Sequence, residues 1–122
     1  MPIVDVTIVV GREEKVTAGL TQALADGVGR GLNSPPGQTW VRLHLLAQDR
    51  YAENNSPLSS TDLPVFVAVL TREIPEQSQL VGTIAKLTQA ISEVTGRPSD
   101  RVHVEYLPSA VGRVAFGGRL LE

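Results

Sequence analysis

The stretch Pro2-Ile3-Val4-Asp5-Val6-Thr7-Ile8-Val9 decides the fold of this chain, because a second stretch like it follows about 62 residues later. That second stretch is Pro64-Val65-Phe66-Val67-Ala68-Val69-Leu70. Both are short apolar runs that open with a proline, as expected of β-strands. Charged residues follow each run, Arg12-Glu13-Glu14 in one case and Arg72-Glu73 in the other. The chain therefore repeats one structural unit.

A helical pattern follows each of the two strands. In the first unit apolar residues recur at every fourth position: Val16, Leu20, Leu24, Val28 and Leu32. The same kind of stripe in the second unit consists of Leu80, Ile84, Leu87, Ile91 and Val94. Glycines stand at the ends of both stripes, Gly29 to Gly31 in one and Gly96 in the other. We expect them to end the helices as left-handed C-caps.

A second strand ends each unit, Trp40–Leu45 in the first and Arg101–Leu107 in the second. A strand-helix-strand crossover makes the two strands of a unit parallel and places the helix on one face of the sheet. We therefore predict an α+β fold. A tandem β-α-β repeat forms a four-stranded core sheet with two helices on one face. The paired glycines within Gly112–Gly118 indicate a short C-terminal hairpin.

The length sets the number of domains. With 122 residues, of which 42% are hydrophobic, the chain has enough apolar material for one compact core. We expect a single domain over residues 1–122, with its two units at about 1–55 and 63–122. The polar, turn-rich segment 54–62 connects the units. Because the helices cover one sheet face only, apolar residues on the other face favour self-association.

The composition excludes several classes of function. The net charge is -2 and no basic cluster is present, so we expect no nucleic-acid partner. The chain has no cysteine and only two histidines, far apart, so we expect no metal and no cofactor. No apolar stretch approaches the ~20 residues of a membrane span, and no signal segment is recognisable. We expect a cytoplasmic protein without a membrane partner.

Pro2 is the first residue with distinctive chemistry. Because Met1 precedes a small residue, we expect its removal, which leaves Pro2 at the amino terminus. A terminal proline carries a secondary amine that can exchange protons or add to a carbonyl. Pro64, its counterpart in the second unit, is internal and has an amide nitrogen that can do neither.

Three arginines stand at or near strand ends. Arg12 follows the first strand, Arg42 lies on the second, and Arg72 ends the third. Arginine forks match carboxylates, so two that converge would bind an anionic substrate and disfavour protonation of a nearby amine. For each arginine the alternative is an ordinary solvated surface position. Tyr51 lies in the polar segment after the second strand, which is either a site loop or a plain turn.

Taken together, these residues resemble the tautomerase superfamily, and within it the 4-oxalocrotonate tautomerase (4-OT) group. Pro2-Ile3 and Gly11-Arg12 match the family's opening. Arg42 falls close to the family's second arginine, allowing one inserted residue, and Gly112–Gly118 looks like its glycine-rich hairpin. The resemblance covers nearly the whole chain and indicates a fused member with two units in one polypeptide. Such members usually form trimers, so the resemblance implies a homotrimer.

The resemblance also implies roles. Pro2 would be the catalytic general base of an isomerase, shifting a proton in a keto-enol or 1,3-allylic tautomerisation of a small carboxylate. Arg12 and Arg42 would bind the carboxylate and polarise the carbonyl. Arg72 is similar in position to an arginine of fused dehalogenases. The family's aromatic site residue in the C-terminal hairpin would align with Val114, with Phe116 two residues further on, and Tyr51 could take its place.

Two alternatives stay open. One is a hydrolytic dehalogenase, hydratase or decarboxylase of small unsaturated acids on the same scaffold. Glu53 is then the candidate for the water-activating acid, while Glu105 stands where such enzymes have a tyrosine. The other is a non-catalytic trimeric binding protein.

Overall fold

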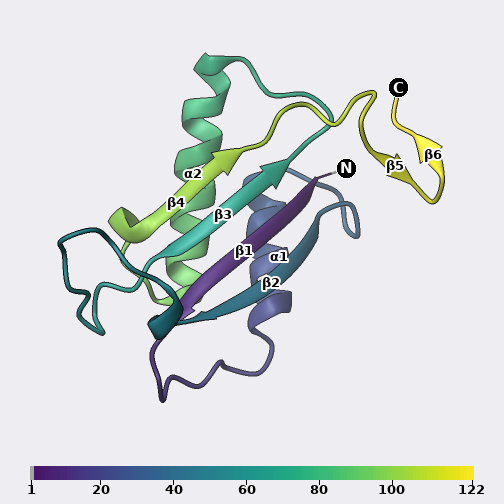
Figure 1. Ribbon diagram of the computed structural model, residues 1–122. Coiled ribbons are helices and arrows are strands. Elements are labelled where there is room, and N and C mark those ends of the chain that lie inside the picture. The colour runs from purple at the N-terminus through teal and green to yellow at the C-terminus, as the bar shows by residue number, and fades with distance from the viewer. Residues whose placement is uncertain (1) are drawn as a thin grey trace.

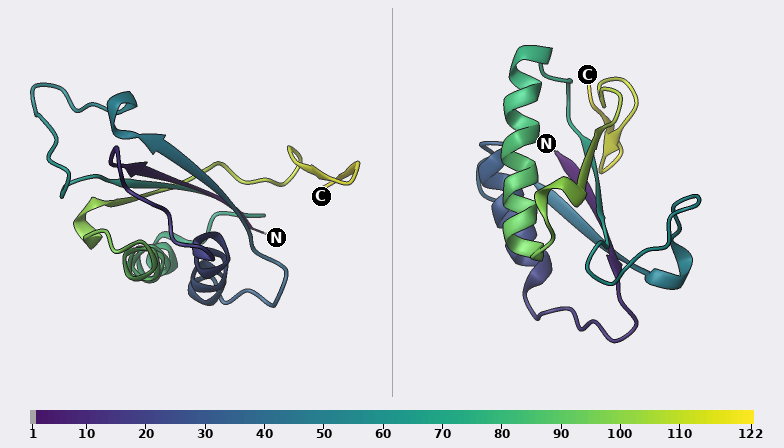
Figure 2. Two further views of the ribbon diagram at one scale, coloured as in Figure 1. Left: turned by 90° about the horizontal axis from the view of Figure 1, so that it is seen from below. Right: turned by 90° about the vertical axis from the view of Figure 1, so that its left-hand side faces the viewer.

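The computed structural model describes residues 2–122, so the removal of Met1 lies outside the described residues. The strands are β1 (Ile3–Val10), β2 (Trp40–Ala47), β3 (Val65–Leu70) and β4 (Val102–Tyr106), and they form one sheet in the order β2-β1-β3-β4. The strands of each unit are parallel, and β1 and β3 are antiparallel at the centre. Helices α1 (Leu20–Gly31) and α2 (Gln77–Thr95) cover one face (Figures 1 and 2). The predicted fold is confirmed.

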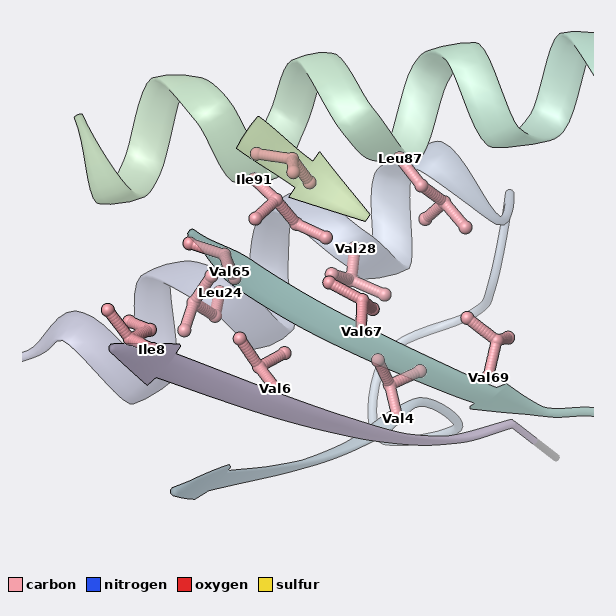
Figure 3. Close-up of a cluster of buried hydrophobic side chains, with 11 residues drawn as sticks. Val4, Val6, Ile8, Leu24, Val28, Val65, Val67, Val69, Leu87 and Ile91 are labelled. Atoms are coloured by element: carbon pink, nitrogen blue, oxygen red, sulfur yellow. The ribbon is translucent and has the colours of Figure 1, made fainter. Parts of the chain in front are cut away.

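The core lies between this sheet and the two helices. Alternate residues of the central strands point toward the helices, as the period of a strand dictates. They meet the apolar stripes of α1 and α2 in one cluster, shown in Figure 3: Val4, Val6, Ile8, Val65, Val67, Val69, Leu24, Val28, Leu87 and Ile91. These ten side chains are at most 4% exposed. The apolar runs and the helical stripes of the sequence therefore meet as predicted.

The first helix differs from its prediction at both ends. Val16 lies outside α1 and is 38% exposed, because the helix begins only at Leu20, after Gly19 in the left-handed conformation. Gly29 and Gly31 lie within the helix and are not left-handed caps; Asn33 adopts positive φ beyond its end. Gly31 allows close packing between the helices, whereas a Cβ on Gly29 would meet open space. A Cβ on Gly31 would come within 3.3 Å of a Leu87 side-chain carbon.

The second helix follows its prediction. α2 contains the whole predicted stripe, with Leu87 and Ile91 fully buried. Gly96 caps it with φ of 72°, and its N–H donates to the carbonyl of Ser92 at 2.9 Å. This is the left-handed C-cap that glycine adopts without steric cost. Within residues 2–122 neither α2 nor α1 combines the length and apolar character needed to span a membrane.

The other face of the sheet carries no helix and mixes side chains of both kinds. Its exposed aromatic residues, Trp40 and Phe66, would favour contact with another surface. Polar and charged side chains also lie on this face, on β1, β2 and β4: Asp5, Thr7, Arg42, His44, His103 and Glu105. This open face is therefore less apolar than the sequence pattern predicted, because β2 and β4 each contribute two polar or charged side chains to it.

A short hairpin ends the chain, as predicted. Its strands β5 (Ala115–Phe116) and β6 (Arg119–Leu120) are antiparallel. Gly117 and Gly118 between them both have positive φ, 59° and 86°, as a type I′ turn requires. The hairpin extends away from the sheet at the end where the chain begins (Figures 1 and 2).

Candidate functional site

The antiparallel pairing of β1 with β3 decides which candidate residues meet. Ile3 pairs with Leu70, so Pro2 and Arg72 lie at one end of the sheet, here called the Pro2 end. Arg12 lies at the opposite end, here called the Arg12 end. β1 has eight residues, and at about 3.3 Å per residue its ends are roughly 25 Å apart. Arg12 therefore does not reach Pro2 of its own chain.

Two aromatic residues lie at the Pro2 end of the sheet. The N–H of Trp40 donates to the carbonyl of Pro2 at 3.0 Å, which continues the parallel ladder of β1 and β2 by one residue. The ring of Phe116 packs edge-on against Trp40, with centroids 5.5 Å apart. The hairpin thus places Phe116 at the Pro2 end.

A hollow of about 420 Å³ opens beside Pro2. Its other walls come from the end of α1 and the loop before β2: Leu32, Ser34, Pro35 and Gln38. The hollow therefore offers an apolar floor with a hydroxyl and an amide at its edge, beside the residue that the sequence singled out. The sequence reasoning missed these four residues, since a loop carries no periodic signal.

The C-terminal segment holds Arg72 in place. The hydroxyl of Ser109 donates to the carbonyl of Arg72, and the guanidinium of Arg72 donates to the carbonyl of Glu122. One residue earlier, the N–H of Ala110 donates to the carbonyl of Thr71 at 3.0 Å. Arg72 stays exposed. A cationic fork is therefore fixed just beyond β3, at the same end as Pro2.

Arg42 lies on the open face, away from both ends. Its Nε and one terminal nitrogen donate to the two carboxylate oxygens of Asp5, at 2.6 and 2.9 Å. His44 lies 3.6 Å from the same carboxylate. Within one chain, then, Arg42 already holds a carboxylate. This bidentate pair lowers the pKa of Asp5, chiefly through the hydrogen bond from Arg42.

We expect the Arg42→Gln variant to raise the pKa of Asp5 toward its ordinary value of 3.8. Because the pKa of Asp5 is lower in the folded state than in the unfolded state, the Arg42–Asp5 pair stabilises the fold at pH values above the unfolded-state pKa. This contribution to the free energy of unfolding is lost as the pH falls through the folded-state pKa. A ¹³C NMR titration of the Asp5 carboxyl checks the shift. Arg50→Gln, which removes an equal charge elsewhere, is the control; an unchanged Asp5 titration in Arg42→Gln would contradict the assignment.

Tyr51 and Glu53 lie at the Arg12 end, in the connection that follows β2 and the short 3₁₀ helix η1 (Gln48–Arg50). The Tyr51 hydroxyl donates to Glu53 at 2.7 Å, and Arg101 donates to the same carboxylate oxygen at 2.6 Å. These two hydrogen bonds lower the pKa of Glu53, while burial first and the bond to Glu53 second raise the pKa of Tyr51. Glu53 is thus an engaged carboxylate.

The structure therefore divides the six predicted site residues. Pro2, Arg72 and Phe116 gather at the Pro2 end, Arg12 and Tyr51 at the Arg12 end, and Arg42 stands between them on the open face (Figure 1). Trp40 belongs with the first group and was not predicted as a site residue. The parallel order of a β-α-β unit is the signal for it, since the first residues of β1 and β2 then lie side by side.

Similarity to known proteins is found among solved structures. No family model matches the sequence, and no curated protein matches it. Among solved structures, the chain is similar to the Q0 fused 4-OT, a symmetric trimer, with 18% identity, TM-score 0.73 and coverage of 97% of this chain and 94% of that one. It is similar to the macrophage migration inhibitory factor of Trichinella spiralis, with 18% identity, TM-score 0.72 and coverage of 97% and 98%.

A third similar structure is the FG41 malonate semialdehyde decarboxylase inhibited by 3-bromopropiolate. It has 14% identity, TM-score 0.70 and coverage of 94% of this chain and 88% of that one. At these identities the likeness establishes a shared fold. Function has to be argued from the side chains.

Proposed function

We propose that this chain, which has the fold of the tautomerase superfamily, is an isomerase that uses Pro2 as a general base on small 2-keto or enol carboxylates. One observation supports the proposal: Ile3 pairs with Leu70, so Pro2 and Arg72 lie at the same end of the sheet, and Pro2 lines an open hollow there. Such a substrate has an exchangeable proton, which the Pro2 amine can accept. It also has a carboxylate, which the Arg72 guanidinium can bind.

The chemistry follows from the two groups. With Met1 removed, the secondary amine of Pro2 takes a proton from the enol oxygen or an acidic carbon, and returns it to the other atom of the conjugated system. The substrate carboxylate accepts hydrogen bonds from the Arg72 guanidinium, which also stabilises negative charge as it moves through the substrate. The positive charge of Arg72 disfavours protonation of a neighbouring amine, which keeps it available as a base.

The walls of the hollow fit a small unsaturated acid. Leu32 and Pro35 supply apolar surface for the carbon chain. Ser34 and Gln38 supply a hydroxyl and an amide that can hydrogen-bond a keto or enol oxygen. We infer that these groups orient the substrate between Pro2 and Arg72.

We also propose a homotrimer, on the strength of the open sheet face with its exposed aromatics and of the trimeric fused 4-OT structure. Arg42, with its carboxylate partner Asp5, then lies where another copy can contact it. In such an assembly Arg42 can contribute to substrate binding from a neighbouring chain. Arg12 and Tyr51 lie far from Pro2 in their own chain.

The hydrolytic alternative lacks its acid in this chain. Glu53, the candidate for activating water, lies at the Arg12 end, and its carboxylate accepts hydrogen bonds from Tyr51 and Arg101. A carboxylate held by an arginine is a weak proton acceptor. The geometry therefore favours proton transfer over hydration.

The test begins with the mass of the purified protein, since a retained Met1 would overturn the proposal. Ketonisation of phenylenolpyruvate and of 2-hydroxymuconate is then followed by absorbance, with heat-denatured protein as the blank. Incubation with 3-bromopropiolate and digestion should show a mass increase on the peptide that begins with Pro2. Labelling confined to other peptides would count against a reactive amine at that residue.

A further inference from the structure

We propose that the Arg12 end holds a second binding site in each chain, which takes a monocarboxylate with a flat apolar body and performs no proton transfer. The site is an open cleft of about 850 Å³, larger than the hollow beside Pro2. Arg12 lies on one side of it, and Tyr51, Pro57 and Leu58 supply apolar surface. The inference stands apart from catalysis at Pro2, because it concerns binding alone.

The repeat explains why a second site exists. Each unit has a proline immediately before its first strand and an arginine two residues beyond the end of that strand: Pro2 and Arg12 around β1, Pro64 and Arg72 around β3. Because β1 and β3 are antiparallel, each proline lies at the same end as the arginine of the other unit. At the Arg12 end the N–H of Val9 donates to the carbonyl of Pro64 at 3.1 Å.

The Pro2 end and the Arg12 end differ in the nitrogen atom of their proline, which decides whether that proline can accept a proton. Pro64 follows Leu63, so its nitrogen is an amide with no basic lone pair, and the residue is fully buried. The Arg12 end therefore has an arginine that can bind a carboxylate, while its proline, Pro64, offers no amine base. A ligand there binds without being isomerised.

Arg12 lies in a turn that is fixed by several hydrogen bonds. The N–H of Glu14 donates to the carbonyl of Gly11 at 3.1 Å, and the Glu14 carboxylate accepts from the N–H of Gly11 at 3.0 Å. Arg97, beyond α2, donates to that carboxylate at 2.9 Å and to the carbonyl of Val9 at 2.8 Å. Within residues 2–122 the guanidinium of Arg12, at the tip of this turn, has no hydrogen-bond or ion-pair partner. It is available for a ligand carboxylate.

Tyr51 contributes an aromatic ring to the lining of the cleft. The Tyr51 hydroxyl is fixed by its hydrogen bond to Glu53, and its ring packs on Phe66 with centroids 5.7 Å apart. Arg101 balances the charge of Glu53. Asp49 also lines the cleft and adds a negative charge that opposes a second carboxylate on the ligand. These features favour one carboxylate joined to a flat apolar body.

The probe is 3-phenylpropionate, which has one carboxylate, one ring and no keto group to tautomerise. Its neutral analogue, 3-phenylpropanamide, has nearly the same shape. We expect titration of the ¹⁵N-labelled protein with the acid to shift the backbone amides of Ala52 and Asn55. The indole of Trp40, the single tryptophan of the chain, reports separately on the Pro2 end. The amide analogue should bind at least tenfold more weakly.

Arg12→Gln and Arg50→Gln form the matched pair, since each removes one exposed charge and Arg50 lies outside the cleft lining. We expect the first to weaken the Ala52 and Asn55 response at least tenfold and the second to change it less than twofold. An unchanged spectrum elsewhere shows that the variants fold. Equal binding by Arg12→Gln, equal binding of the amide, or shifts confined to Trp40 would each overturn the second site. The last outcome would leave the proposal for Pro2 intact.

Discussion

Replacement of Pro2 by alanine is expected to lower kcat/KM for phenylenolpyruvate by about 10²- to 10⁴-fold, the usual contribution of a positioned general base. The secondary amine of proline is fixed by its ring and by the hydrogen bond from Trp40 to the Pro2 carbonyl. Alanine leaves a primary amine that can rotate away from the reacting atoms. Steady-state kinetics at several pH values measure the loss, and the acid limb of the profile should change with it.

Two further variants test whether the loss of activity is specific to the terminal amine of Pro2. Pro98→Ala removes an exposed proline outside the walls of the Pro2 hollow, and should leave kcat/KM within about twofold of the wild type. Insertion of one alanine before Pro2 makes Pro2 internal while the chain keeps a terminal amine, about 3.3 Å further out. This insertion should lose as much activity as Pro2→Ala. Full activity in either Pro2→Ala or the insertion would rule out a proline base.

The largest expected effect on stability comes from Leu87→Ala, with a loss of about 2–5 kcal/mol in the free energy of unfolding. Leu87 is fully buried in the cluster between the sheet and the helices (Figure 3). Its side chain packs where α1 comes close enough that Gly31 has no room for a Cβ without displacement. The two helix backbones hold this spacing, so the cavity left by alanine cannot collapse fully.

Val81→Ala on the same helix is the control for this prediction. Val81 is 67% exposed, so its truncation should change the free energy of unfolding by no more than about 0.5 kcal/mol. Urea unfolding followed by circular dichroism measures both, at equal chain concentration because assembly adds to apparent stability. A loss below about 1 kcal/mol for Leu87→Ala would show that the core does not depend on this contact.

Most of the fold followed from local patterns. The two proline-led apolar runs and the two helical stripes predicted the strands, the helices and their crossovers, because alternation and fourfold spacing report directly which face of an element is buried. The first helix shows the limit of this reasoning. Val16 continues the spacing but lies outside α1, and Gly31 was interpreted as a cap although it serves helix packing. The spacing of apolar residues in the sequence does not show which other residues each of them contacts.

The composition of the candidate site depended on contacts between residues far apart in the sequence. The sequence by itself identified the chemistry of Pro2, Arg12, Arg72 and Tyr51, because an amine, a guanidinium or a phenol is a property of the residue. Only the tertiary structure decided which of them meet, since the antiparallel pairing of β1 with β3 is a contact between residues about sixty positions apart. That pairing places Arg72 at the same end of the sheet as Pro2 and leaves Arg12 and Tyr51 at the far end.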